Sequence, residues 1–166
     1  MEITTIDPFL DYWKSVRGRT RRVIETIPED RMDWSYAAGK FTFGGIIRHL
    51  ATIERYMYGE TVQGKPSSYP GYDRSLQQEN ETPLEFMDRL DAESVEIFRR
   101  LSDEDLTRKC VTPAGSSITI WKWLRAMVEH EAHHRGQLYM MLSMLGVATP
   151  PLYGLTEEEV RAKSGH

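Results

Sequence analysis

The chain has 166 residues, of which 40% are apolar and 28% charged, and its formal net charge is −4. This length and balance are typical of one globular domain with a hydrophobic core. The acidic balance argues against a protein that binds nucleic acid, and no run of about 18 apolar residues is present to span a membrane. The N-terminus does not resemble a secretory signal, and a single cysteine, Cys110, excludes an internal disulfide, so we expect a cytoplasmic protein.

The first predicted helix begins at Asp7-Pro8, where an N-cap residue precedes a proline in the first turn. We expect it to end near Thr26, before Pro28. The loop over residues 28–41 contains a tryptophan and a tyrosine that we expect to turn inward. The first predicted helix also carries five cations: Lys14, Arg17, Arg19, Arg21 and Arg22. We expect these cations to form a solvated face rather than a contact with nucleic acid or an acidic substrate.

The second and third helices are predicted from their capping residues. Thr42 is the expected cap of a helix over residues 43–58, and Gly59 is expected to end it. Residues 82–85, Thr-Pro-Leu-Glu, form a capping box with proline at the first helical position, which predicts a helix over residues 83–101.

The C-terminal half contains one long predicted helix, from a cap at Thr119 to Leu145, preceded by an irregular or hairpin-like connection over residues 107–118. A capping box at Thr156 predicts a short C-terminal helix. Four helices without a convincing run of strands indicate an all-α four-helix bundle. The long loop over residues 61–81 permits a crossover connection, and it could cover a site, carry dimer contacts or be disordered.

Three of the five histidines fall in the segment VEHEAHHRGQLYMM, residues 128–141. At about 100° per residue, the apolar stripe of this helix is centred about 60° from His130, and His134 lies about 40° from His130. We therefore expect both side chains to face the bundle interior, and His133 to lie at the margin. In the second helix, His49 lies on the shoulder of the apolar stripe in the same way.

The spacing of His130 and His134 places two imidazoles on one helix face, about 5–6 Å apart at Cβ, where they can bind one metal ion. A pair of hydrogen-bonded core histidines is an equally weighted interpretation, because buried imidazoles need polar partners. A third imidazole, from His49, would complete a three-histidine site with open positions, the pattern of catalytic metal centres. Spacing alone does not show that the two helices face each other.

Three segments of the chain resemble the DinB-like (DinB/YfiT) family of small bacterial metal-binding proteins: GGIIRHLATIERYMYG, HEAHHRGQLYMMLSMLGV and TPPLYGLTEEEVR. The resemblance covers about Asp7 to Arg161 and implies one four-helix-bundle domain over residues 1–166. It also implies a divalent metal held by His49, His130 and His134, and a homodimer. The characterised relatives include thiol-dependent S-transferases and a mycothiol-dependent isomerase, and the family name does not imply DNA binding.

A divalent ion in such a site lowers the pKa of a bound water or low-molecular-weight thiol. We expect Zn or Ni, although Fe or Mn also accept histidine ligands. The first hypothesis is therefore a hydrolase or thiol S-transferase acting on a small-molecule substrate. The second is a non-catalytic metal-binding stress-response or interaction module acting as a dimer, and the third is a bundle with merely structural histidines.

Three further residues are candidates for a place beside the metal: Glu131, Gln137 and Tyr56. A carboxylate at Glu131 would orient a ligand by accepting an imidazole N–H, although we slightly favour a surface or interhelical charge there. Gln137 and Tyr56 project close enough to reach the site, but Tyr56 is more typical of core packing. We expect Cys110 to be buried or inert.

Overall fold

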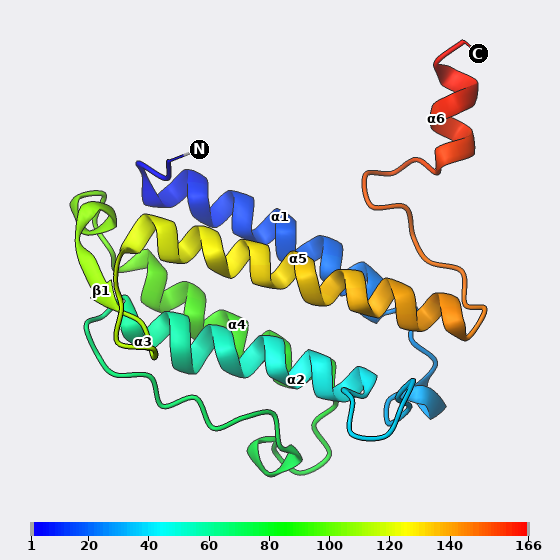
Figure 1. Cartoon of the computed structure of the whole chain (residues 1–166), viewed down its shortest axis with the longest axis horizontal. Coiled ribbons are helices and arrows are strands. Elements are labelled where there is room, and N and C mark those ends of the chain that lie inside the picture. Colours follow the sequence, from blue (N-terminus) through cyan, green and yellow to red (C-terminus); the bar gives the residue numbers. More distant parts are fainter. Residues whose placement is uncertain (1, 166) are drawn as a thin grey trace.

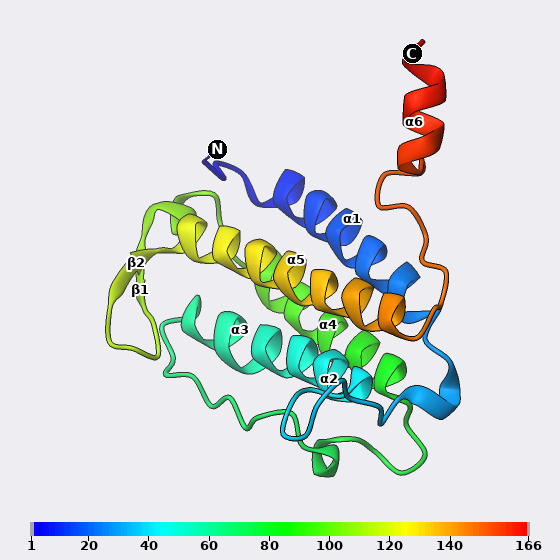
Figure 2. The same ribbon diagram turned by 45° about the vertical axis from the view of Figure 1, so that its right-hand side comes forward.

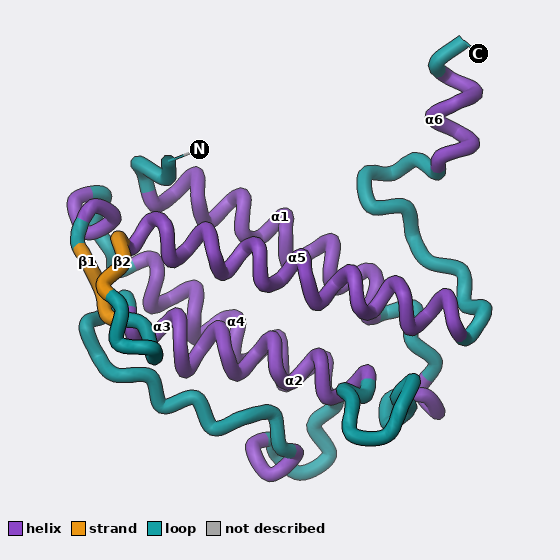
Figure 3. Tube along the Cα trace, viewed as in Figure 1, coloured by secondary structure: helices purple, strands orange, loops and turns teal. Residues whose placement is uncertain are grey.

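The computed structural model describes residues 2–165, in which four long helices form a bundle (Figure 1). The long helices are α1 (Ile6–Ile24), α2 (Phe43–Ile53), α4 (Pro83–Arg99) and α5 (Ile120–Met144). The only strands in the described part of the chain are β1 (Lys109–Val111) and β2 (Ser117–Thr119), which pair antiparallel as a hairpin before α5 (Figure 3). The predicted all-α four-helix bundle is confirmed.

The helices are not arranged in simple chain order. α1 packs against α4 and α5, and α2 packs against the same two helices, so α1 and α2 lie across a diagonal of the bundle (Figure 2). α2 and α4 run in the same direction, and the chain between them returns along the length of the bundle (Figure 1). This return, over residues 62–82, is the predicted long crossover.

The start of α1 differs from the prediction. The helix begins at Ile6, and its N-cap is Thr5, whose side chain makes no capping hydrogen bond. The Ile6 N–H instead donates to Asp103 Oδ1 at 2.8 Å. The prediction of Asp7 as the N-cap was wrong because the carboxylate of Asp103, which is distant in sequence and lies in the segment just after α4, replaces a local cap.

The end of the second helix also differs from the prediction, because Gly59 does not stop it. α2 continues through a π-helical turn, Glu54–Tyr58, into α3, Gly59–Thr61. A Cβ atom on Gly59 would lie 3.4 Å from the Glu54 carbonyl oxygen and from Ile97 Cδ1. These are ordinary contact distances, and Gly59 has α-helical backbone angles, with φ −61° and ψ −35°, so it continues the helix. The turn that ends the helix contains Gly64 at φ 76°.

A polar layer divides the interior of the bundle into two apolar clusters. Arg17, predicted to be solvated, is only 7% exposed and lies in this layer. It forms ion pairs with Glu54 and with Glu131, the second at 3.1 Å. The prediction of a solvated cationic face was wrong for this residue, because two buried carboxylates from other helices neutralise it. Lys14 and Arg22 are exposed as expected, and Arg19 and Arg21 are half-buried.

The C-terminal segment leaves the bundle. The capping box at Thr156 is present and opens α6 (Glu157–Lys163), which stands away from the other helices (Figures 1 and 2).

In the loop before α2, Trp34 stacks on Phe43 as expected of an inward side chain, whereas Tyr36 is exposed. No helix within residues 2–165 has the length and apolar character needed to cross a membrane.

Candidate metal centre

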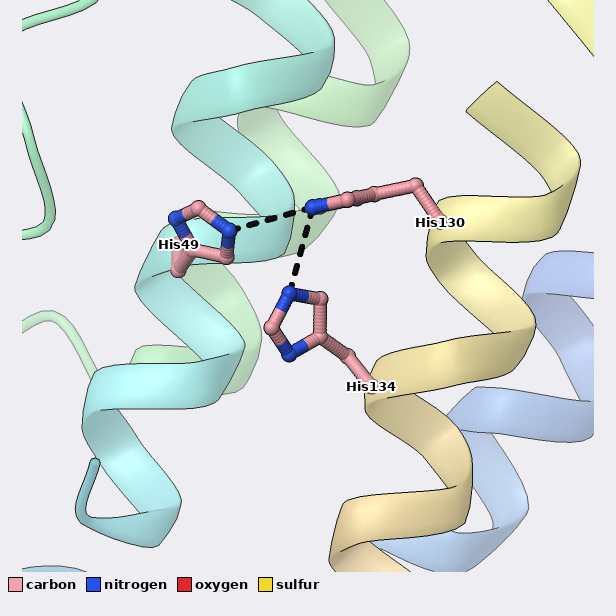
Figure 4. A group of neighbouring side chains, drawn as sticks. All are labelled: His49, His130 and His134. Carbon is pink, nitrogen blue, oxygen red and sulfur yellow. Dashed lines mark hydrogen bonds between the residues drawn. The ribbon is translucent and has the colours of Figure 1, made fainter. Parts of the chain in front are cut away.

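Three histidines from α2 and α5 converge in the bundle (Figure 4). The Nε2 atom of His130 lies 3.2 Å from His49 Nε2 and 3.1 Å from His134 Nε2. The three candidate ligand atoms all lie within 4.8 Å of one another. The two helices therefore face each other, which the spacing in the sequence did not show.

The burial of these histidines follows the helical projection. His134 is buried, His49 and His130 are half-buried, and the neighbouring His133 is exposed. His133 nevertheless remains linked to the group, because its Nε2 atom lies 3.2 Å from Gln137 Nε2. His49 and His130 are therefore not sealed inside the core of the bundle.

Two polar side chains orient two of the imidazoles. Gln137 Oε1 lies 2.7 Å from His134 Nδ1, and the Tyr69 hydroxyl lies 2.7 Å from His49 Nδ1. An amide oxygen can only accept, so His134 Nδ1 carries the hydrogen and its Nε2 presents a lone pair to the cluster. A hydroxyl that accepts from His49 Nδ1–H gives His49 the same tautomer.

This donor set fits a divalent metal ion. Zn–N bonds of about 2.0–2.1 Å in tetrahedral geometry place nitrogens about 3.3–3.4 Å apart, close to the separations of 3.1 and 3.2 Å. Without a cation, a single N–H on His130 Nε2 would have to donate to the lone pairs of both His49 Nε2 and His134 Nε2. An ion satisfies all three nitrogens, so the geometry favours a metal site over hydrogen-bonded core histidines.

The imidazoles are neutral near pH 7, as metal ligands must be. Burial, with a smaller contribution from nearby His134, lowers the pKa of His49 to about 4. Burial and the neighbouring His134 lower the pKa of His130 to about 3. The pKa of His134 is lowered by burial, and its hydrogen bond with Gln137 opposes that shift.

Aromatic rings from two loops surround the histidines. The Phe41 ring lies 5.2 Å from the His49 ring and 5.7 Å from the His134 ring. Tyr69 and Tyr72 belong to the crossover, and the Tyr72 ring lies 6.2 Å from His49. The crossover thus covers one side of the site, which was one of its three predicted roles. None of the three rings was predicted to lie near the histidines, although tyrosines in a polar, proline-rich loop were an available signal.

The candidates predicted beside the metal have different surroundings. Gln137 contacts a histidine, as its projection indicated. Glu131 is turned away from the histidines and pairs with Arg17, so the interhelical charge is the correct interpretation. The Arg55 guanidinium carbon lies 5.0 Å from the centroid of the Tyr56 ring. The hydroxyl that reaches a histidine belongs to Tyr69 instead. Cys110 is buried, and burial raises the pKa of its thiol, as expected of an inert cysteine.

A sequence model of the DinB superfamily matches residues 12–138. The chain belongs to the DinB superfamily. Its relatives include the uncharacterized protein YjoA of Bacillus subtilis, 26% identical over 147 residues, which cover 87% of this chain and 93% of YjoA. OB0413 of Oceanobacillus iheyensis, named as a proposed metal-dependent hydrolase, is 21% identical over 155 residues, covering 86% of this chain and 90% of OB0413.

Solved structures support the same fold. The crystal structure of YjoA, a DinB-like protein of Bacillus subtilis, superposes with a TM-score of 0.71 at 22% identity, covering 90% of this chain and all of that chain. YfiT of Bacillus subtilis superposes with a TM-score of 0.64 at 20% identity, covering 86% and 89% of the two chains. YfiT is described as a probable metal-dependent hydrolase with an unusual four-helix bundle topology. At these identities the likeness shows the fold alone.

Proposed function

We propose that this DinB-superfamily protein is a metal-dependent enzyme in which His49, His130 and His134 hold one divalent ion, with hydrolysis of a small molecule as its first candidate reaction. The observation that carries the proposal is the convergence of three Nε2 atoms. The names of OB0413, a proposed metal-dependent hydrolase, and of YfiT, described as a probable one, support the same reaction class. When bound, such an ion acts as a Lewis acid and lowers the pKa of a coordinated water or thiol.

The protein's own residues prepare the site in three ways. Gln137 and Tyr69 orient the imidazoles through their Nδ1 atoms, so that the Nε2 lone pairs face inward. Burial keeps the imidazoles unprotonated, so that no proton competes with the ion near neutral pH. The Phe41 and Tyr72 rings place apolar surface beside the imidazoles on one side of the site, where low polarity strengthens electrostatic interactions.

A thiol S-transferase would use the same centre, with a low-molecular-weight thiol in place of water. We expect Zn or Ni as the ion, with Fe or Mn as further candidates, because imidazole suits all of them. We also propose that the protein is cytoplasmic and forms a homodimer, and light scattering of the purified protein would test the dimer. The non-catalytic metal-binding module requires no access for a small molecule, and the half-exposed His49 and His130 favour the enzyme.

Activity of metal-free and metal-reloaded protein tests the proposal. The protein is stripped with a chelator, reloaded with Zn²⁺ or Ni²⁺, and assayed with a panel of esters and amides and with an electrophile plus cysteine. The account expects turnover in at least one assay that depends on the metal and is lost in His134→Ala. Full turnover by the stripped protein would contradict it, and metal binding without any turnover would favour the non-catalytic module.

A further inference from the structure

A hollow of about 300 Å³ lies beside the histidine cluster. Most of the residues that line it carry apolar groups: Tyr36, Phe41 and Tyr72 contribute rings, and Ile46, Met140 and Met141 contribute aliphatic and thioether groups. Lys40 and Gln137 add polar groups, so the surface of the hollow is both polar and apolar. Ligand sites of proteins are typically concave and lined by apolar and aromatic side chains with a few polar groups. The hollow has that composition, and neither the fold nor the metal ligands require it.

The hollow and the histidine cluster share two walls. Phe41 lines the hollow, and its ring contacts both His49 and His134. Gln137 also lines the hollow, while its Oε1 atom holds His134 Nδ1. Phe41 and Gln137 therefore stand between the hollow and the histidines, and a molecule held at the three Nε2 atoms would extend past these two side chains to reach the hollow.

The charge of the lining limits what the hollow accepts. Lys40 is the one charged residue among those that line it, and no carboxylate does so. A cationic group would therefore lose its hydration there without gaining an opposite charge. An uncharged group meets mainly rings and methionines, and an anionic group at the rim meets the Lys40 ammonium.

The volume limits the size of the occupant. The hollow, at about 300 Å³, is at the lower end of small-molecule sites. A water molecule occupies about 30 Å³ in the liquid, so the space admits roughly ten non-hydrogen atoms. A phenyl ring with a short chain has this size.

We propose that this hollow binds the non-reacting part of the substrate, and that this part is an uncharged or anionic, mainly apolar group of roughly ten non-hydrogen atoms, preferably aromatic. The inference rests on the proposed function, because it places the reacting group at the histidine centre. The substrate class that follows is a small aryl- or alkyl-bearing molecule without a cation at its apolar end.

Two hydroxamates distinguish binding in the hollow from binding to the metal. Acetohydroxamate carries only the metal-binding group, whereas 4-phenylbutanohydroxamate adds a ring on a short chain. Titration calorimetry on the Zn²⁺-loaded protein should show the phenyl compound binding about tenfold more tightly or better, since burying one ring contributes that much. An ammonium group on the ring should abolish this gain, whereas a carboxylate should preserve most of it.

Two methionines on α5 supply a matched pair of variants. Met140 is 51% exposed and lines the hollow, whereas Met144, one turn later and 59% exposed, does not. Met140→Glu should remove most of the gain from the phenyl group, and Met144→Glu should keep it. Acetohydroxamate should bind equally to all three proteins, because the side chains that orient the histidines are those of Gln137 and Tyr69.

The outcomes distinguish this inference from the proposed function. An equal gain from the phenyl group in wild type and Met140→Glu would overturn the inference while leaving the metal site intact. Failure of acetohydroxamate to bind any metal-loaded sample would contradict the proposed function. In that case 4-phenylbutanoate, which lacks the hydroxamate, is titrated into the metal-free protein. Equal binding to wild type and Met140→Glu would overturn the inference as well.

Discussion

At the scale of single residues, the three imidazoles depend on the side chains behind them. The i, i+4 spacing of His130 and His134 was readable because both lie on one helix, where geometry follows from the sequence. The contact of Tyr69 with His49 could not be predicted, because Tyr69 belongs to a loop whose path is defined only in the folded bundle. Its role shows that the ligands of a site are easier to predict than the residues that orient them.

Gln137→Leu should lower the affinity for Zn²⁺ by about 10–100-fold, because His134 then loses the acceptor that fixes its tautomer. Competition with a chromophoric chelator measures the dissociation constant. Gln78→Leu is the control, since its side chain is exposed and belongs to the crossover. Unchanged affinity in Gln137→Leu would show that the hydrogen bond at 2.7 Å does not orient the ligand.

Lower pH should destabilise the metal-free protein. In the unfolded chain the imidazole pKa is near 6.5, whereas burial holds the pKa of His49 at about 4 and that of His130 at about 3. Between these values the unfolded chain binds more protons, so the free energy of unfolding falls as the pH drops below about 6.5. Urea denaturation at several pH values measures this slope, and His130→Gln should make it shallower. A slope that is the same in the variant and the wild type would contradict the account.

At the scale of elements, helix boundaries were predictable where the stop or start is local. The capping box at Thr82 opens α4 as predicted, because all its partners lie within four residues. The start of α1 was not predictable, because it depends on Asp103, which is distant in sequence. The end of the second helix was not predictable either, because the chain continues through a π-helical turn that its sequence did not indicate. That turn has a wider repeat than an α-helix, and within it Glu54 faces the polar layer.

Thr82→Ala should lower the free energy of unfolding by about 1 kcal/mol, because the Glu85 N–H loses the side-chain oxygen that caps α4. Urea denaturation measures the change. Thr5→Ala is the control, since this N-cap of α1 makes no side-chain hydrogen bond and should cost little. Equal losses in the two variants would contradict the assignment of the caps.

At the scale of the whole molecule, the bundle combines two apolar clusters with a charged layer between them. Apolar periodicity and capping residues predicted the helices, but the sequence analysis treated Arg17 as one of five surface cations. Arg17 was mispredicted because its partners, Glu54 and Glu131, come from two other helices. Pairings between helices that are distant in sequence set the layer, and one sequence does not show them.

Arg17→Met should lower the free energy of unfolding by about 3–5 kcal/mol, because two buried carboxylates would lose their cation. Combining it with Glu131→Gln should restore part of the loss. Arg22→Met, on the exposed side of the same helix, should change the free energy of unfolding by less than about 0.5 kcal/mol. Chemical denaturation of the metal-free proteins measures all three, and a neutral Arg17→Met would contradict the buried ion pairs.

The central claim is that His49, His130 and His134 hold one metal ion, and elemental analysis tests it most directly. Wild type, His130→Ala and His133→Ala are purified without a metal-affinity tag, and the divalent metal in each is measured. The account predicts about one ion per chain in wild type and in His133→Ala, and a sharp loss in His130→Ala. Full metal content in His130→Ala, or no uptake by the wild type after Zn²⁺ or Ni²⁺ is added, would contradict the claim.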